Sequence, residues 1–249
     1  MKMFSPLSQF DVFSVWNLNF GNLFFFNINN LNLVMFSVFV FFFLTYFFFL
    51  EEMKIIPKKI QFVFELLFLF VYRLVFTQTG KKGLIFMPFL FTIFIVILLL
   101  NVVSLMPFSF AVTSHFIWSL YIALSTCFGI FILGLINFKL DYLKIFLQNV
   151  PILLFPLMTL IELASYVIRA FSLAIRLSAN LLAGHILVDI IAEVISFLNY
   201  YLIDLSFVVL ALLIALFFLE VGVACLQAYV FILLITIYLN DAVNLHLHI

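Results

Sequence analysis

The sequence predicts an all-α integral membrane protein. We expect three or four spanning or interfacial helices, followed by two long, strongly tilted C-terminal helices that form a hairpin. Of the 249 residues, 68% are hydrophobic and only 9% are charged, whereas soluble chains average about 45–50% apolar and about 25% charged residues. Lipid is therefore the expected solvent, and lipid admits only helices or closed barrels. Barrel strands alternate apolar and polar residues, but the apolar runs here are continuous, which favours helices.

Charge and cysteine content exclude several classes of function. The formal net charge is zero, so no basic surface for nucleic acid is expected. Cys127 and Cys225 lie inside apolar runs, which indicates packing rather than a disulfide or a metal site. No nucleotide-binding motif is present, and we expect neither a cofactor nor a catalytic site in this chain. The N-terminus does not resemble a secretory or transit peptide, which favours synthesis in an organelle or a bacterium.

The first half of the chain divides at its charged residues. Residues 1–30 are rich in Asn and Phe and predict an exposed segment with an interfacial turn. Residues 31–50 carry no charge and match the length of about 20 residues that a spanning helix needs. Residues 57–80 mix Lys, Glu and Arg with apolar residues, which favours an amphipathic interfacial helix, although a tilted span stays open. Residues 84–137 predict a helical hairpin with its loop at 106–115.

Two long apolar stretches make up the second half. One runs from Pro156 to about residue 198, and the other covers residues 205–239. A break is expected near Asn199 and Asp204. Both stretches exceed one perpendicular span, so the pair at 156–240 is expected to be strongly tilted.

The positive charges predict the orientation of this single membrane domain, 1–249. Lys and Arg gather in residues 51–83 and recur in 138–150, but the loop at 106–115 has none. By the positive-inside rule, residues 51–83 and 138–150 lie on the inner side of the membrane, so the N-terminus is outside and the C-terminus inside. No internal repeat is visible, which argues against transporters built from inverted repeats.

Ionisable residues inside the penultimate stretch are the main functional signal. Each one costs about 2.5–3.5 kcal/mol at the centre of a spanning helix, and such groups usually mark a path for ions or protons. A helix that served only as an anchor would have none. This stretch nevertheless contains Glu162, Arg169, Arg176, His185, Asp189 and Glu193.

The spacing of these residues predicts two polar faces. At about 100° per residue, residues spaced by seven fall on one face of a helix. Glu162, Arg169 and Arg176 have this spacing, and Asn180 lies near them. Residues spaced by four form a second stripe roughly opposite Arg176: His185, Asp189 and Glu193. In the last helix, Glu220 and Gln227 share a face. A hairpin turning at residues 199–204 would bring Glu220 towards the second stripe, where histidine and glutamate can pass protons.

Other interpretations stay open for part of this set. Arg169 and Glu193 fit interfacial side chains that extend to water, and Glu162 fits a structural partner of Arg169. Arg176 has the poorest structural explanation, because it is far from either end of its segment. A transporter or channel with Arg176 as an anion site is one rival, although few donors surround it. A purely structural anchor is another rival, and it leaves the buried charges unexplained.

Three segments, in the same order along the chain, resemble subunit a of the F-type ATP synthase, and most closely its mitochondrial form. They are NVVSLMPFSFAVTSHF at 101–116, SLAIRLSANLLAGH at 172–185 and LEVGVACLQAYVFILLITIYLNDAVNLH at 219–246. The resemblance runs from about residue 84 to the C-terminus, and it is weaker but colinear before that. It implies a stator protein whose two tilted helices curve around the ring of c subunits. It also implies contacts with the peripheral stalk and other membrane-sector subunits, in a mitochondrial inner membrane crossed several times by an organelle-encoded chain.

The resemblance also implies roles for individual residues. Protons would enter one half-channel, protonate a carboxylate of the c-ring and leave by the other half-channel. Arg176 matches the arginine that separates the half-channels, and Asn180 and Gln227 match polar residues beside it. His185 and Glu220 match the pair that lines the outer half-channel, in the order typical of mitochondrial members. Glu162 matches an inner acid, and Asp189 and Glu193, at less standard positions, complete the expected proton-translocating set.

Overall fold

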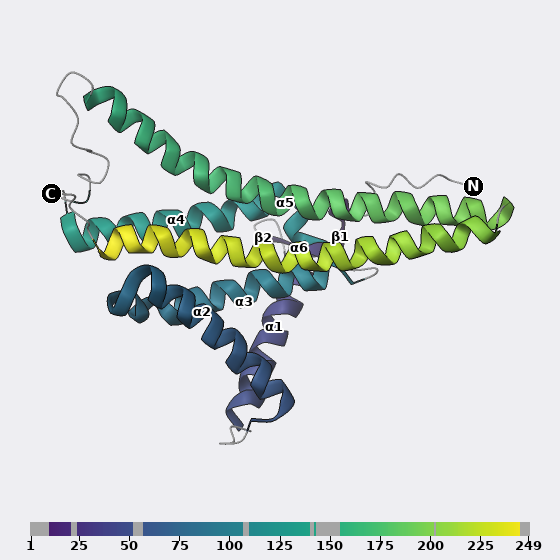
Figure 1. Ribbon diagram of the computed structural model, residues 1–249, viewed down its shortest axis with the longest axis horizontal. Coiled ribbons are helices and arrows are strands. Elements are labelled where there is room, and N and C mark those ends of the chain that lie inside the picture. Colours follow the sequence, from purple (N-terminus) through teal and green to yellow (C-terminus); the bar gives the residue numbers. More distant parts are fainter. Residues whose placement is uncertain are drawn as a thin grey trace. The chain divides into compact units, whose positions relative to one another are not determined.

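The computed structural model is almost entirely helical (Figure 1). It describes residues 10–20, 24–51, 57–106, 110–139, 142, 155–201 and 203–244. Its helices are α1 (Asn30–Glu51), α2 (Lys59–Gly83), α3 (Met87–Ser104), α4 (Phe116–Phe138), α5 (Phe155–Tyr201) and α6 (Ile203–Val243). The predicted all-α class is confirmed, and the predicted first span agrees with α1 to within one residue at each end.

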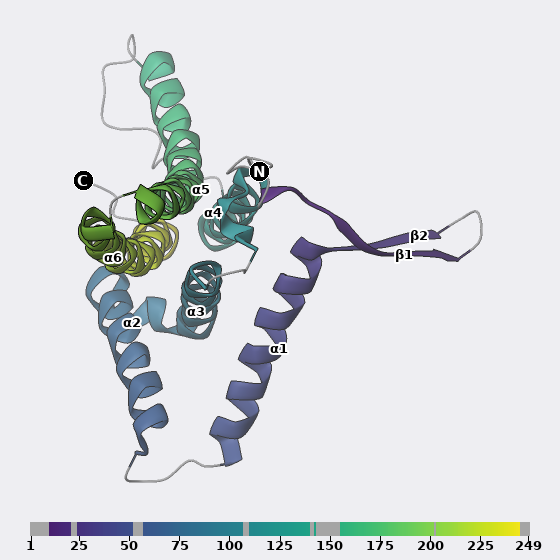
Figure 2. The same ribbon diagram turned by 90° about the vertical axis from the view of Figure 1, so that its right-hand side faces the viewer.

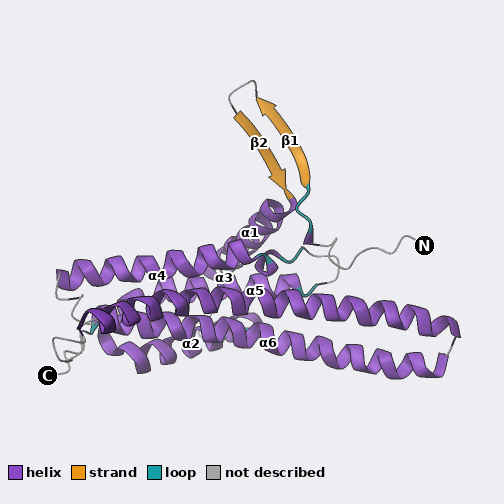
Figure 3. Cartoon of the chain, turned by 90° about the horizontal axis from the view of Figure 1, so that it is seen from above, coloured by secondary structure: helices purple, strands orange, loops and turns teal. Residues whose placement is uncertain are grey.

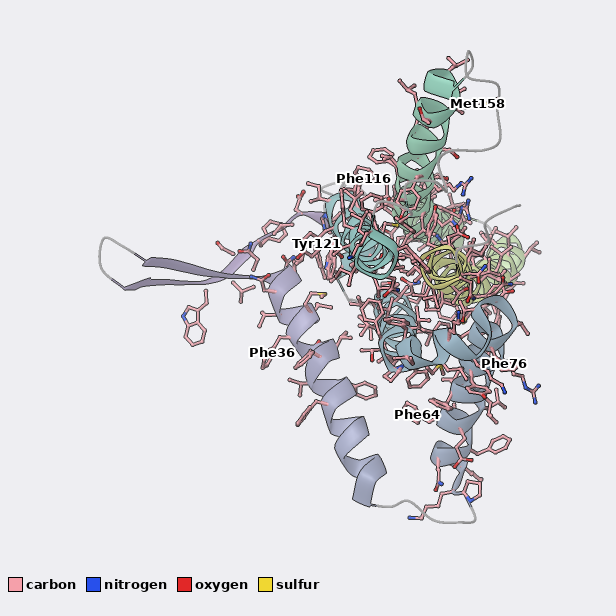
Figure 4. All side chains as sticks on the ribbon, turned by 90° about the vertical axis from the view of Figure 1, so that its left-hand side faces the viewer. Phe36, Phe64, Phe76, Phe116, Tyr121 and Met158 are labelled. Atoms are coloured by element: carbon pink, nitrogen blue, oxygen red, sulfur yellow. The ribbon has the colours of Figure 1, made fainter. Side chains whose placement is uncertain are left out.

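Four stretches of the described chain are apolar and long enough to cross a membrane: Gln61–Ser104, Phe116–Phe138, Leu157–Phe197 and Phe207–Val243. Large apolar side chains cover the outer surfaces of the helices. Phe36 of α1 and Tyr121 of α4 extend away from their helices in Figure 4, and both are exposed. Such a surface is stable in contact with lipid, because exposure of the same apolar area to water would be unfavourable.

The N-terminal region forms a β-hairpin, which the sequence reading did not predict. Strands β1 (Ser14–Phe20) and β2 (Phe24–Asn29) pair antiparallel and extend from the start of α1 (Figures 2 and 3). We expected an exposed segment with a turn there, and the turn was the only element predicted. The signal for the strands is the alternation of Asn with apolar residues in WNLNF, followed by the turn-favouring pair Gly21-Asn22.

Asn30 joins the hairpin to the first long helix. Its Nδ2 donates a hydrogen bond to the Asp11 carbonyl at 3.1 Å. Its backbone N donates to the Phe13 carbonyl, also at 3.1 Å. The base of the hairpin is therefore fixed to the first residue of α1.

Helix α2 is interrupted close to its end. Gly80 has φ 65° and ψ −159°, a conformation that a residue with a Cβ rarely adopts. Val71, Val75 and Thr79 form its buried stripe, while most of the remaining surface is exposed. The helix thus agrees with the predicted segment at 57–80, and its interfacial placement stays a prediction.

The chain divides into two compact units. The first comprises Met1–Phe47, Val96–Phe116 and Leu177–Gln227, and the second comprises Phe48–Ile95, Ile117–Arg176 and Ala228–Ile249. Each is described by itself below.

In the first unit, the C-terminal part of α5 and the N-terminal part of α6 run antiparallel as a hairpin (Figures 1 and 3). Leu105, Leu181 and Ala224 are buried together there. The predicted break is shorter than expected. Tyr200 and Asp204 are both helical, since this segment contains no glycine or proline that would end a helix early.

In the second unit, side chains link α4, α5 and α6 through backbone carbonyls. Ser119 Oγ donates to the Ala174 carbonyl at 3.1 Å, and Tyr166 Oη donates to the Cys127 carbonyl at 3.2 Å. Asn137 Nδ2 donates to the Ala242 carbonyl at 3.3 Å. Inside a membrane, an apolar side chain gains little by contacting another helix instead of lipid. Hydrogen bonds of this kind therefore help to hold the helices together.

Tyr142 lies in the predicted polar connector at 138–150, most of which is outside the described residues. Burial, with a smaller contribution from Asp241, raises the pKa of Tyr142 to about 12. Its ring lies against Gly134 of α4, where any Cβ would collide with it. A residue without a side chain is therefore needed at Gly134 for this tyrosine to be buried.

Candidate functional site

A buried carboxyl group packs against a glycine between α5 and α6 in the first unit. Glu220 is only 8% exposed. A Cβ added at Gly184 would lie 2.6 Å from Glu220 Oε1 and 2.9 Å from its Cδ. These distances are shorter than real Cβ contacts, so the carboxyl group occupies space that only glycine leaves free.

Two polar atoms of this region are buried without a protein partner. Glu220 Oε1 and His185 Nε2 are shielded from solvent and have no hydrogen-bond partner among the residues that the structure describes. Leaving one such atom unsatisfied costs about 1–3 kcal/mol. Buried polar atoms of this kind mark a catalytic or transport role, or a place where ordered water binds.

Asp189 connects these two groups electrostatically. It lies one helical turn beyond His185 on α5. It is close enough to interact with the charged forms of both His185 and Glu220. Glu220 also packs against Gly184, the residue that precedes His185 on α5. That these residues share one proton path stays a prediction.

A polar pair lies further along the same two helices. Asn180 Nδ2 donates a long hydrogen bond, 3.4 Å, to Gln227 Oε1. Gln227 is 6% exposed, and like Glu220 it belongs to the buried face of α6. The prediction that Glu220 and Gln227 share a face agrees with their common burial.

Asn101 is a polar residue of the same unit that the sequence reading missed. Its side chain is fully buried, and its Nδ2 donates to the Ala224 carbonyl of α6 at 3.2 Å. Ala224 lies between Glu220 and Gln227 on α6, so the bond fixes α6 beside both polar groups. The available signal was a single Asn within the apolar run LFTIFIVILLLNVV.

Arg176, in the second unit, lies on an exposed face of α5. Leu173, Ala174 and Leu177 are buried around the other side of the helix. Arg176 itself is exposed, as are three small residues within two helical turns of it: Ser172, Ala179 and Ala183. Within the described residues Arg176 has no ion pair. The helix therefore presents an uncompensated charge on a face of low side-chain volume.

The remaining predicted residues are less constrained by the structure. Arg169 is exposed in the second unit, beside the hydroxyl of Tyr238. Glu193 is exposed near the end of α5. The side chain of Glu162 lies outside the described residues. Its role in proton translocation therefore stays a prediction, and pairing with Arg169 stays an alternative.

His115 is a loop residue, as expected. It stacks on Phe110 with ring centroids 5.1 Å apart. Burial lowers the pKa of its imidazole, which therefore stays neutral at neutral pH.

Comparison with known proteins identifies the family. A family model described as ATP synthase A chain matches residues 31–240. Proteins called ATP synthase subunit a are similar over nearly their full length. The one from Brassica napus is 40% identical over 257 residues, covering 97% of each chain. Those from Marchantia polymorpha and Chondrus crispus are 37% and 36% identical, each covering 97% of this chain and 99% and 97% of their own.

The chain belongs to the ATP synthase subunit a family. Its relatives are subunits of the ATP synthase by name, so the family places this chain in the membrane sector of that complex. These relatives match almost the whole sequence, in agreement with a resemblance that was expected to be strongest from residue 84 and weaker but colinear before it.

Gly184 offers a direct test of the geometry around the carboxyl group. In Gly184→Ala, the Glu220 side chain must rotate to avoid the added methyl group. An off-rotamer side chain costs about 0.5–1.5 kcal/mol, and if this cost appears in the barrier to proton transfer the rate falls about two- to twelvefold. We expect ATP-driven proton pumping by membrane vesicles to fall in this range, with normal assembly.

Gly129→Ala is the matched control, because a Cβ there meets no atom within 4 Å. It should pump like the wild type. Equal pumping by both alanine variants would show that Gly184 does not set the position of Glu220.

Proposed function

We propose that this chain is the proton-translocating stator subunit of a rotary ATP synthase, located in the mitochondrial inner membrane. Two half-channels load and unload protons on the carboxylates of a c-ring, and Arg176 separates them. The chain holds no catalytic site of its own. Its partners are the c-ring, the peripheral stalk and other membrane-sector subunits, with the lipid bilayer around them. The N-terminus and the loop at 106–115 face outwards.

The observation that carries this proposal is the exposed, uncompensated Arg176 on a face of small side chains. A guanidinium keeps its proton at any accessible pH. Facing lipid, it would be strongly unfavourable. Facing a ring carboxylate it forms a charge pair, and the small neighbours Ser172 and Ala179 let another helix approach closely.

The same charge explains how the half-channels stay separate. A group that never releases its proton cannot relay protons from one half-channel to the other. Its positive charge also stabilises the ionised form of a passing carboxylate, which favours release of that proton. Arg176 therefore acts as a barrier and as an electrostatic switch, without carrying the proton.

The buried polar cluster of the first unit supports the outer half-channel. His185 and Glu220 supply buried atoms that can take up a proton or bind water. Asp189 interacts with both. Glu193 is exposed about two turns beyond His185 and suits the entry of the path. Asn180 lies between His185 and Arg176 in the sequence of α5, and its amide donates a hydrogen bond to Gln227.

The inner half-channel is assigned to Glu162. This residue lies fourteen positions before Arg176 on the same helix, about 21 Å along its axis. Such a distance leaves room for a separate aqueous path on the other side of Arg176. The division of the charged residues of α5 to either side of Arg176 is what two half-channels require.

Replacement of Arg176 tests the central assignment. Arg176→Ala should reduce ATP-driven proton pumping by vesicles to background, because the barrier and the switch are both lost. Arg176→Lys should also be impaired, since an ammonium group loses its proton more readily in an apolar site. Arg73→Ala, which removes an exposed arginine of α2, is the control and should pump normally. Wild-type pumping by Arg176→Ala would contradict the proposal.

Replacement of Glu220 tests the outer path separately. Glu220→Gln keeps the shape of the side chain but removes the carboxyl group that can bind and release a proton. Proton conduction should fall about a hundredfold, the low end of what a positioned proton-transferring group contributes. Glu65→Gln changes an exposed carboxylate that bonds Gln61 on α2 and should leave conduction intact. Unchanged conduction in Glu220→Gln would remove this residue from the pathway.

A further inference from the structure

Phe10, which precedes the β-hairpin, contacts His185 of the predicted outer half-channel. The rings of Phe10 and His185 meet in a T-shaped arrangement, with centroids 6.2 Å apart and an interplanar angle of 78°. This is a preferred geometry for aromatic pairs, in which the edge of one ring meets the face of the other. The two residues are 175 positions apart in the sequence, so nothing in the local pattern of either segment predicts the contact.

We propose that Phe10 is a positioning residue for His185: it fixes the orientation of the imidazole and covers it from the outer aqueous phase. The proposal rests on the proposed function, in which His185 lines the outer path. It adds that Phe10 forms part of the wall of this path.

The surroundings of His185 explain why a ring contact matters there. His185 Nε2 has no hydrogen-bond partner within the described part of the chain. A histidine that moves protons normally has its ring orientation set by the bond of one nitrogen. Because no described residue bonds His185 Nε2, the packed phenyl ring of Phe10 restricts rotation about the side-chain bonds of His185 instead.

Phe10 is held in place by its neighbours in the sequence. Asp11 and Phe13 accept hydrogen bonds from Asn30, the first residue of α1. Phe10 is itself half-buried, whereas Phe13 is 60% exposed. A segment tied to a spanning helix one residue away can hold a side chain in a fixed place, unlike a frayed terminus.

The first arm of the test measures access to position 185. The assembled complex carries His185→Cys with Cys127→Ala and Cys225→Ser, and a membrane-impermeant thiol reagent is added to the outer side. Adding Phe10→Ala should increase the labelling rate severalfold. Adding Phe13→Ala, the matched control on the same segment, should leave it unchanged. Equal labelling rates for the two alanine variants would overturn the proposal that Phe10 is a cover.

The second arm keeps His185 and measures ATP-driven proton pumping at matched ATP hydrolysis and matched subunit content. Phe10→Ala should lower pumping severalfold. Phe10→Tyr keeps the ring and should restore it, whereas Phe10→Leu keeps bulk without a ring and should not. Restoration by leucine equal to that by tyrosine would contradict a role for the ring contact.

The two arms separate this proposal from the proposed function. If His185→Ala pumped normally, His185 would not belong to the path and the positioning role would be lost. The labelling arm would still report whether Phe10 covers position 185. If Glu220→Gln and His185→Ala both abolished pumping while Phe10→Ala had no effect in either arm, the half-channel would stand and the role of Phe10 would be wrong.

Discussion

A guanidinium group on the exposed surface of an apolar helix is the constraint on which the rest of this structure depends. Left in lipid, the charge of Arg176 would cost about 2.5–3.5 kcal/mol or more, and no described residue of the chain neutralises it. The helix face around it is built accordingly: Ser172 and Ala179 keep side-chain volume low, and the bulky Leu173 and Leu177 turn inwards. A partner that brings a negative charge would stabilise such a face.

The part of α5 beyond Arg176 packs against polar groups of α6. Glu220 and Gln227 are both buried on α6, where Glu220 packs against Gly184 of α5 and Gln227 accepts a hydrogen bond from Asn180. Gly184 gives the carboxyl group its space, and Asn101 fixes the backbone of α6 nearby. Helix α5 thus carries an exposed arginine, and residues further along it contact the polar groups of α6. His185 follows Arg176 by nine residues, which places it about 180° around the helix from the arginine.

Local sequence pattern accounts for the helices but not for the contacts between them. The apolar runs predicted α1, α3, α4 and the α5–α6 pair, and the spacing of seven placed Glu220 with Gln227. The hairpin of β1 and β2 was missed, because its alternation is short and no charged residue separates it from α1. The contacts of Phe10 with His185 and of Gly184 with Glu220 join segments distant in sequence. The periodicity within one helix does not indicate which residues of two distant segments meet. These contacts therefore could not be predicted from the sequence pattern.

The claim that the Arg176 face of α5 meets the c-ring is tested most directly by cross-linking. Ala179 lies on this exposed face one turn from Arg176, whereas Leu181 is buried against Leu105 and Ala224. In a background without Cys127 and Cys225, single cysteines at 179 and 181 would be oxidised in complexes whose c subunit carries a cysteine one turn from its carboxylate. Cross-linking from position 179 and none from 181 is the predicted result. Cross-linking from 181 with none from 179 would contradict the account.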